Sequence, residues 1–256
     1  MSDFATYPDL SGASVFITGG GSGIGANVTE GFLRQGAKVA FIGRSDASAF
    51  VEEMAEATGN RPLFVQGDIT DIGALRAAMD QAADAHGTIT RLINNAANDQ
   101  RHGSLEVDEA FWDWSIAINF KAYFFACQHA IRGMKTVGHG HIVNFTSISY
   151  MMGNAGYALY TGSNSGLNGL TRSLAREFGP DNIRVNALAP GWVLTQKQLD
   201  KWADPDSLAA HLDRQCLKDH LTPDDIVNPT LFLASKASRM MTGQAMVVDG
   251  GVVVTG

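Results

Sequence analysis

Residues 14–35 of the chain read SVFITGGGSGIGANVTEGFLRQ, an apolar run followed by a glycine-rich turn and a helical pattern. The run Ser14–Thr18 predicts a short buried strand, and the residues after the glycines predict a helix. Glycines between two such elements let the backbone approach a pyrophosphate, whose charge would meet free N–H groups and the helix dipole. Gly21, Gly23 and Ala26 have the spacing of the dinucleotide fingerprint. The segment therefore predicts the first strand–helix unit of a nucleotide-binding sheet, with a glycine-rich turn without a ligand as the alternative.

The same alternation of strand and helix patterns continues to the end of the chain. The further predicted strands are Lys38–Ile42, Leu63–Gln66, Thr90–Ile93, Ile142–Phe145, Ile183–Ala189 and Met246–Val248, and the predicted helices include Ile72–His86, about Asp108–Met134 and Leu159–Phe178. Strands that alternate with helices pair in parallel and are covered on both faces. We therefore expect the α/β class, with residues 1–256 forming a single domain on a doubly wound, Rossmann-like parallel sheet. The polar, helix-prone stretch around residues 195–216 predicts a lid over the substrate.

Composition and charge argue against several functional classes. A length of 256 residues suffices for one buried core, and a formal net charge of -7 without a basic stripe argues against a nucleic-acid or anionic membrane partner. The first ten residues lack the pattern of a secretory signal, and no segment is long and apolar enough to span a membrane. Two separate cysteines, Cys127 and Cys216, suit a reducing compartment, so we expect a cytoplasmic protein that acts on a small molecule. His139 and His141 lack a third ligand, so we expect no metal site.

Hydroxyl-bearing side chains gather after the predicted strand Ile142–Phe145. Ser147 and Ser149 follow this strand, and the next helix carries Tyr160, with Asn164 one turn further on the same face. A hydroxyl group at the carboxyl end of a strand therefore faces a phenol on the following helix. Because the glycine-rich turn also follows a strand, both features are predicted to lie at the same edge of the sheet.

These residues carry a resemblance to the short-chain dehydrogenase/reductase family that covers nearly the whole chain. Besides Ser147 and Tyr160, the resemblance rests on Ser163, Leu170, Thr171, Arg172 and Leu174, on Thr18-Gly19-x-x-x-Gly23-Ile24-Gly25, and on Asn94-Asn95-Ala96-Ala97. It implies that Tyr160 is the acid/base, that Ser147 hydrogen-bonds the substrate oxygen and that Asn119 completes a proton relay. Asn164 stands where the family has lysine, and its amide can bond a ribose hydroxyl but brings no charge to lower the pKa of the tyrosine. We therefore expect weak activity near neutral pH, rising toward the pKa of Tyr160, or almost none.

The resemblance also implies a nicotinamide dinucleotide and the residues that hold it. The cofactor candidates are Gly19, Gly21, Ser22, Gly23, Ile24, Gly25, Arg44, Asp68, Ile69, Asn95, Ala96, Tyr160, Asn164, Pro190, Gly191, Val193 and Thr195. No acidic residue ends the strand Lys38–Ile42 to bond the ribose hydroxyl of NAD, whereas Arg44 can pair with the 2′-phosphate of NADP. NADP is therefore favoured over NAD, with a solvated arginine as the alternative. Asp68 is expected to contact the edge of the adenine ring, to cap the following helix, or both.

The polar loop Asn98–His102 indicates the class of substrate. It resembles the loop of the aldose (sugar) 1-dehydrogenases within the family, as does Gln215–Lys218, and the alternative is a solvated surface loop. The substrate candidates are Asn98, Arg101, His102, Ser149 and Trp192. We expect hydride transfer between NAD(P) and a sugar or polyol hydroxyl, which takes C1 of an aldose to a lactone. The alternatives are a short-chain dehydrogenase for another alcohol or ketone, and a catalytically silent nucleotide-binding protein.

The resemblance further implies a homotetramer, because members of the family commonly pair two long helices across a dimer axis. Gly162, Gly166 and Gly169 on the helix of Tyr160 would allow a second helix to approach closely. Small residues at these positions could equally face the sheet.

Overall fold

A computed structural model describes residues 4–254 of the chain. Its centre is one sheet of seven parallel strands in the order β3-β2-β1-β4-β5-β6-β7. The strands are β1 (Ser14–Thr18), β2 (Lys38–Gly43), β3 (Leu63–Gln66), β4 (Arg91–Asn94), β5 (Gly140–Phe145), β6 (Ile183–Pro190) and β7 (Ala245–Val248). The sheet grows outward in both directions from β1, which confirms the predicted doubly wound parallel arrangement.

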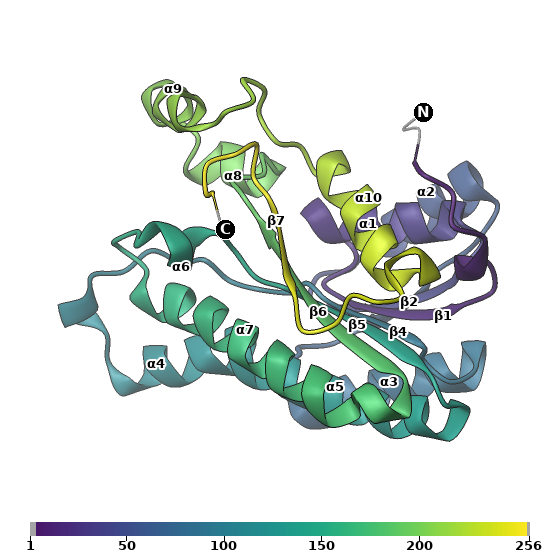
Figure 1. Ribbon diagram of the computed structural model, residues 1–256. Coiled ribbons are helices and arrows are strands. Elements are labelled where there is room, and N and C mark those ends of the chain that lie inside the picture. Colours follow the sequence, from purple (N-terminus) through teal and green to yellow (C-terminus); the bar gives the residue numbers. More distant parts are fainter. Residues whose placement is uncertain (1–3, 255–256) are drawn as a thin grey trace.

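Helices cover both faces of this sheet. Figure 1 shows α1, α2 and α10 above it and α3, α5 and α7 below it. The helices are α1 (Gly23–Arg34), α2 (Ser48–Thr58), α3 (Ile72–His86), α4 (Glu109–Ile116), α5 (Ala122–Val137), α6 (Ser149–Met152), α7 (Ala158–Phe178), α8 (Gln196–Lys201), α9 (Pro205–Arg214) and α10 (Asp224–Ala234). Successive residues of a strand point to opposite faces, so Val15 and Ile17 pack with Phe32 of α1, while Phe16 packs with Leu75 of α3. Each such fully buried side chain stabilises the fold by about 1.5–3 kcal/mol.

The helix predicted at about Asp108–Met134 is present, but it contains an irregularity that the prediction lacked. It consists of α4, a π-helical turn over Ala117–Lys121, and α5, without a break between them. In the π turn the N–H of Ala122 donates to the carbonyl of Ala117, one residue further back than in an α-helix. The extra residue puts the faces of α4 out of phase with those of α5. Trp112 of α4 is 51% exposed.

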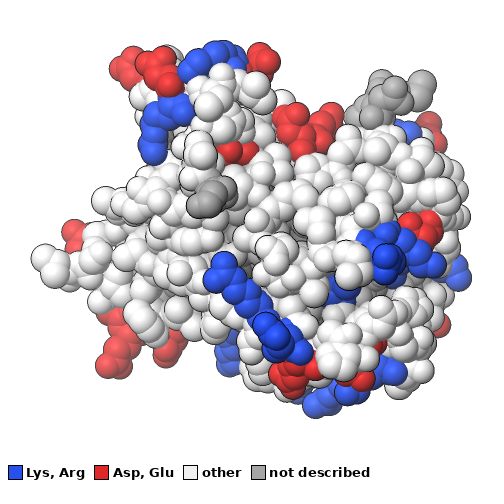
Figure 2. Space-filling view, in the orientation of Figure 1, with Lys and Arg blue, Asp and Glu red and all other residues white. Residues whose placement is uncertain are grey.

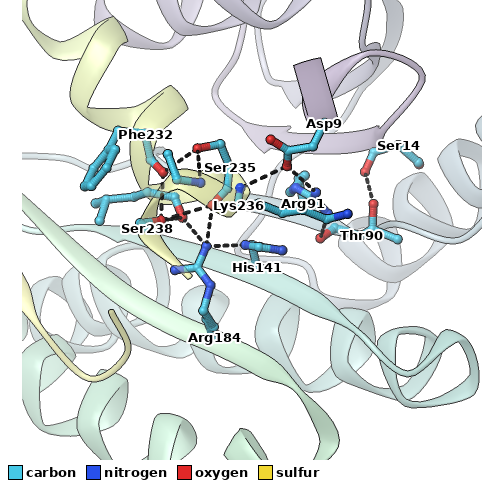
Figure 3. A network of polar contacts seen from close by, with 12 residues as sticks. Asp9, Ser14, Thr90, Arg91, His141, Arg184, Phe232, Ser235, Lys236 and Ser238 are labelled. Atoms are coloured by element: carbon cyan, nitrogen blue, oxygen red, sulfur yellow. Dashed lines mark hydrogen bonds and ion pairs between the residues drawn. The ribbon is translucent and has the colours of Figure 1, made fainter. Parts of the chain in front are cut away.

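A buried network of charged and polar groups closes the edge at which the strands begin, as Figure 3 shows. Arg184 of β6 donates to two backbone carbonyl groups at the end of α10 and contacts the ring of His141. Arg91 of β4 pairs with Asp9 at 3.4 Å. Burial and the charges of the two arginines lower the pKa of His141 to about 2, so its ring is neutral. The network ties α10 to the sheet at the edge remote from the carboxyl ends of the strands.

The face seen in Figure 2 carries acidic and basic side chains interspersed, most densely over α8 and α9 at the upper left. Within residues 4–254, no helix has both the length and the apolar character that crossing a membrane requires. In the same part of the chain, no three His, Cys, Asp or Glu side chains are grouped so that they could hold a metal ion.

Candidate active site

A cavity of about 1340 Å³ lies at the edge where the strands end. Its wall is built from the turn after β1, from the loops after β2 to β6, and from α7, α8 and α9. Every predicted cofactor residue lies in this wall: Gly19, Gly21, Ser22, Gly23, Ile24, Gly25, Arg44, Asp68, Ile69, Asn95, Ala96, Tyr160, Asn164, Pro190, Gly191, Val193 and Thr195. The fold therefore brings residues from distant parts of the sequence into one place.

The glycine-rich turn has the shape that a bound phosphate group requires. Gly19 and Gly23 have φ angles of 69° and 53°, which residues with a side chain rarely adopt. A Cβ atom on Gly25 would lie 2.0 Å from the carbonyl oxygen of Gly19, so the turn is tight because it lacks side chains. Helix α1 begins at Gly23, and the side chain of the preceding Ser22 caps none of its N–H groups. These N–H groups can therefore bind an anion at the positive end of the helix, and the turn fits a dinucleotide.

Two asparagines after β4 hold this turn and the neighbouring helix in place. Asn95 Nδ2 donates to the carbonyl groups of Gly19 and of the residue before it, at 3.1 Å each. Asn94 Nδ2 donates to Asn144 Oδ1 at 2.9 Å, and Asn144 Nδ2 donates to Thr171 Oγ1 of α7 at 3.0 Å. A chain of buried hydrogen bonds fixes the groups that it joins. It therefore sets α7 relative to the ends of β4 and β5.

The loops after β2 and β3 carry the residues predicted at the adenosine end of the cofactor. The guanidinium group of Arg44 is exposed in the cavity wall and lies 4.0 Å from the carboxylate of Asp68, which makes a weak, solvated pair. Asp68 Oδ1 accepts from the N–H of Thr70, whereas α3 is capped by Asp71, whose side chain accepts from the N–H of Ala74. A helix-capping role for Asp68 is therefore wrong, and its contact with adenine stays a prediction.

The hydroxyl groups of Ser147 and Tyr160 interact in the cavity. Ser147 follows β5, and its Oγ accepts from the N–H of Ser149 at 3.1 Å, which orients the serine. Burial and the negative charge of Asp99 raise the pKa of Tyr160 to about 12, and hydrogen bonding from Ser147 and Asn164 lowers it by less. The phenol is therefore protonated at neutral pH, and only a very small fraction can act as a base.

Asn164 is buried one turn after Tyr160 and is held against its own helix. Its Nδ2 donates to the backbone carbonyl of Tyr160 at 2.8 Å, and Asn168 Nδ2 makes the same bond to the carbonyl of Asn164 at 2.8 Å. Short polar side chains within helices often bond to the preceding turn in this way. Among the described residues, the charge that acts on the phenol is the carboxylate of Asp99, which disfavours the phenolate. Within residues 4–254, no cation that acts on the phenol takes the place of the family's lysine.

Asn119 anchors the polar loop rather than lining the cavity. It lies in the π turn, where its Oδ1 accepts from the N–H of Asn98 at 2.8 Å and its Nδ2 donates to the carbonyl of Asn98 at 3.0 Å. Its side chain is therefore a positioning group for the loop 98–102. A role for its backbone carbonyl in a proton relay stays a prediction.

The substrate candidates divide into two groups. Arg101, Ser149 and Trp192 lie in the cavity wall. Asn98 is held by the π turn, and His102 Nε2 accepts from a backbone N–H group at the start of α7 at 3.4 Å. Neither of these two residues lines the cavity. Both instead hold the loop 98–102 in place through their contacts with the π turn and with α7. As substrate contacts they stay predictions.

Sequence reasoning missed the contacts that hold α8 over the cavity. Lys197 Nζ lies 2.7 Å from Asp99 Oδ1, and Gln198 Nε2 donates to Asp99 Oδ2 at 2.8 Å. Asp99, Lys197 and Gln198 are termed the clasp below. Burial raises the pKa of the Asp99 carboxyl group. The hydrogen bond and charge of Lys197, together with the hydrogen bond from Gln198, outweigh this effect and hold the pKa below its ordinary value. Gln198 Oε1 also accepts from Trp192 Nε1 at 2.9 Å, so the indole N–H of this substrate candidate is already engaged. No local pattern signals the clasp, because Lys197 lies 98 residues from Asp99.

Comparison with known proteins places this site in a family. A family model described as enoyl-(acyl carrier protein) reductase matches residues 19–253. A structure from Sinorhizobium meliloti 1021, provisionally named a short-chain alcohol dehydrogenase, superposes with a TM-score of 0.90 at 33% identity over 94% of this chain and 96% of that one. The chain belongs to the short-chain dehydrogenase/reductase family.

Two relatives within this family have sugar names. The chain is 46% identical over 248 residues to a protein of Rhizobium meliloti (strain 1021) named probable galactose dehydrogenase, with 96% of this chain and 97% of that protein covered. It is 41% identical over 249 residues to D-xylose 1-dehydrogenase of Caulobacter vibrioides, with 96% and 98% covered. This short-chain dehydrogenase is therefore a nicotinamide-dependent oxidoreductase.

Proposed function

We propose that this short-chain dehydrogenase oxidises the C1 hydroxyl of an aldose, or the hydroxyl of a similar polyol. The observation that carries the proposal is the convergence of Ser147 and Tyr160 with the glycine-rich turn in one cavity. The names of the two relatives, galactose dehydrogenase and D-xylose 1-dehydrogenase, support a sugar as the substrate. The presence of Arg101 in the cavity wall supports a substrate with several oxygen atoms.

The side chains of the cavity would share the work of this reaction. A bound nicotinamide ring would supply the acceptor for the hydride that leaves C1. Ser147 holds the C1 oxygen by a hydrogen bond, and Tyr160 as phenolate accepts the hydroxyl proton, so the C–O bond becomes the carbonyl of a lactone. Asn164 would offer its amide to a hydroxyl of the nicotinamide ribose. Because the pKa of Tyr160 is about 12, turnover should be slow at neutral pH and rise with pH.

NADP is the proposed cofactor in preference to NAD. The guanidinium group of Arg44 stands exposed at the end of β2, where it can form charge-assisted bonds to a 2′-phosphate. Asp46, the first acidic residue after β2, accepts from the N–H and the hydroxyl of Ser48 and so is already bonded at the start of α2. In the described part of the chain, the end of β2 therefore offers a cation for the phosphate of NADP, whereas the acidic residue that follows it is already bonded.

Turnover of a substrate panel tests the proposal. The oxidation of D-galactose, D-xylose and cyclohexanol should be assayed with NADP and with NAD between about pH 7 and pH 10. Tyr160→Phe is the control variant, and thermal melting checks that it folds. We expect oxidation of the sugars with NADP, increasing with pH and lost in the variant. Turnover of cyclohexanol alone would favour a dehydrogenase for another alcohol. Binding of NADP without turnover at any pH would favour the silent nucleotide-binding protein, the candidate that Asn164 supports.

A cytoplasmic homotetramer with a mobile lid is the proposed state of the protein. On α7, a Cβ atom on Gly162 or Gly169 would meet no described atom within 4 Å, and Phe124 of α5 is 39% exposed, so these helix faces leave room for a second copy. Gly166 instead faces Phe120 of the same chain. Sedimentation of the wild-type chain and of Gly169→Arg should show a tetramer that the arginine dissociates. The proposed lid comprises α8, which the clasp holds over the cavity, and α9.

A further inference from the structure

Arg101 is held at the cavity by two aromatic rings. Its guanidinium carbon lies 3.8 Å from the centre of the Tyr157 ring and 5.3 Å from the centre of the Trp202 ring. Tyr157 in turn stacks on Tyr160, with ring centres 5.6 Å apart and planes 13° apart. Aromatic faces attract a guanidinium group and leave the N–H groups at its edge able to donate. The ring of Tyr157 therefore lies between Arg101 and Tyr160, the acid/base candidate. The N–H groups of Arg101 remain able to donate to a ligand.

Three carboxylates that line the same cavity as Arg101 accept hydrogen bonds from other residues. Asp99 is bonded by the clasp, Asp200 accepts from a glutamine one turn earlier in α8, and Asp204 accepts from a serine in the first turn of α9. Across residues 4–254, Arg101 takes part in no hydrogen bond or ion pair. Its contacts with the two rings are the interactions that hold it.

Three further polar groups in the same wall have no partner among the described residues: Trp202 Nε1, Ser149 Oγ and His211 Nε2. Trp202 Nε1, on the ring that faces Arg101, is buried without an acceptor. Ser149 Oγ is also unpartnered, and Ser149 is 3% exposed. A buried donor without an acceptor is costly, so a turn of the Trp202 ring that brings its covered N–H group to an oxygen acceptor of a ligand gains binding free energy. The cavity thus has hydrogen-bonding capacity in two places: at Ser147 and Tyr160, and at Arg101 and Trp202.

We propose that Arg101 and Trp202 Nε1 bind the oxygen substituent at the end of the sugar remote from C1. The residues then determine specificity, because a substrate without oxygen at that end leaves both donors unpaired. Trp202 directly follows α8 in the lid, whereas Arg101 belongs to the loop after β4. A sugar held by both residues therefore links the lid to the body of the protein, as the clasp does. The inference rests on the proposed sugar oxidation, and the oxygen could be that of a hydroxyl or of a carboxylate.

Three sugars that differ at C6 alone test this proposal. D-galactose carries a hydroxymethyl group there, D-fucose a methyl group and D-galacturonate a carboxylate. Their dissociation constants should be measured by calorimetry with the chain saturated with NADP, so that the result does not depend on turnover. We expect D-galactose to bind about 10-fold more tightly than D-fucose, the ratio that one lost hydrogen bond produces. If D-galacturonate binds more tightly still, the natural substituent is a carboxylate, and if it binds less tightly, the substituent is a hydroxyl.

Variants assign the preference to the two donors. Arg101→Gln should bring the ratio of D-fucose to D-galactose dissociation constants close to one, and Trp202→Phe, which keeps the ring and loses the N–H group, should reduce the ratio in part. Arg132→Gln removes the same charge from the exposed face of α5 outside the cavity and should leave the ratio unchanged.

Any of three results would overturn the inference. The wild-type chain could bind D-galactose and D-fucose equally, Arg101→Gln could leave the ratio of dissociation constants unchanged, or none of the three sugars could bind. The proposed function fails separately. If the sugars bind with the expected pattern but neither the wild-type chain nor Asn164→Lys oxidises them, the binding role of Arg101 stands and sugar oxidation falls. If sugars are oxidised without any preference at C6, sugar oxidation stands and the role of Arg101 falls.

Discussion

Replacing Asn164 by lysine should supply the positive charge that the phenol of Tyr160 lacks. Asn164 lies one helical turn after Tyr160, whose pKa stands at about 12 because of burial and the charge of Asp99. Side chains one turn apart are neighbours, so the new ammonium group can lie about 5 Å from the phenol oxygen. At an effective dielectric constant of about 20, this attraction amounts to about 3 kcal/mol, or about 2 pKa units. The pKa of Tyr160 should therefore fall to about 10.

The assay is kcat/KM for an aldose as a function of pH, from about pH 6 to about pH 10.5. The phenolate fraction at pH 7 rises about 100-fold in Asn164→Lys, but a weaker base accepts a proton less readily, so kcat/KM should rise about 10- to 100-fold. The wild-type profile should climb about tenfold per pH unit across the whole range, because the pKa lies above it. The profile of the lysine variant should level off near pH 10.

Asn164→Gln is the matched control, because it lengthens the side chain without adding charge. It should keep the wild-type profile. If the lysine variant is no faster at pH 7, or if glutamine accelerates the reaction as much as lysine does, then the missing charge does not limit this site and the reasoning from the pKa of Tyr160 is refuted.

Three further perturbations probe the cofactor site, the clasp and the turn. Arg44→Gln should weaken the binding of NADP by about 10- to 100-fold, because one charge-assisted hydrogen bond is lost, and the binding of NAD by less than twofold. Fluorescence titration measures both affinities. An equal loss for the two nucleotides would contradict the assignment of Arg44 to the 2′-phosphate. Asp99→Asn removes a charge that raises the pKa of Tyr160, so the pH profile should move toward lower pH, and a shift toward higher pH would contradict the assigned sign. Gly25→Ala would place a Cβ atom 2.0 Å from the carbonyl oxygen of Gly19. It should therefore destabilise the fold by more than about 2 kcal/mol and weaken NADP binding. An unchanged denaturation midpoint would count against the described turn.

Much of the sheet could be predicted because its signals are local. Helix α3 ends where the pattern of Ile72–His86 predicted, and β1 and β3 also have the predicted bounds. The π turn at Ala117–Lys121 escaped prediction because apolar residues continue through it, and one additional residue per turn leaves no mark in a helical pattern.

The site residues that follow directly after a strand could be predicted from the sequence. The contacts between residues that are far apart in the sequence could not. Ser147 and Tyr160 follow consecutive elements, and parallel strands bring their carboxyl ends to one edge, so their meeting follows from the fold. The clasp joins Asp99 to a helix 98 residues later, and the stacking of Arg101 on Trp202 depends on the course of the lid. These contacts are set by tertiary packing, so they emerge only in the folded chain.

The position of a bound sugar tests the central claim most directly. In a crystal structure of the wild-type chain with NADP and an aldose, the C1 hydroxyl oxygen should lie within about 3.2 Å of both Tyr160 Oη and Ser147 Oγ. The pyrophosphate of the cofactor should contact the N–H groups of the turn at Gly19–Gly25. A sugar bound with C1 turned away from the two hydroxyl groups, beside a correctly seated cofactor, would contradict the proposed chemistry.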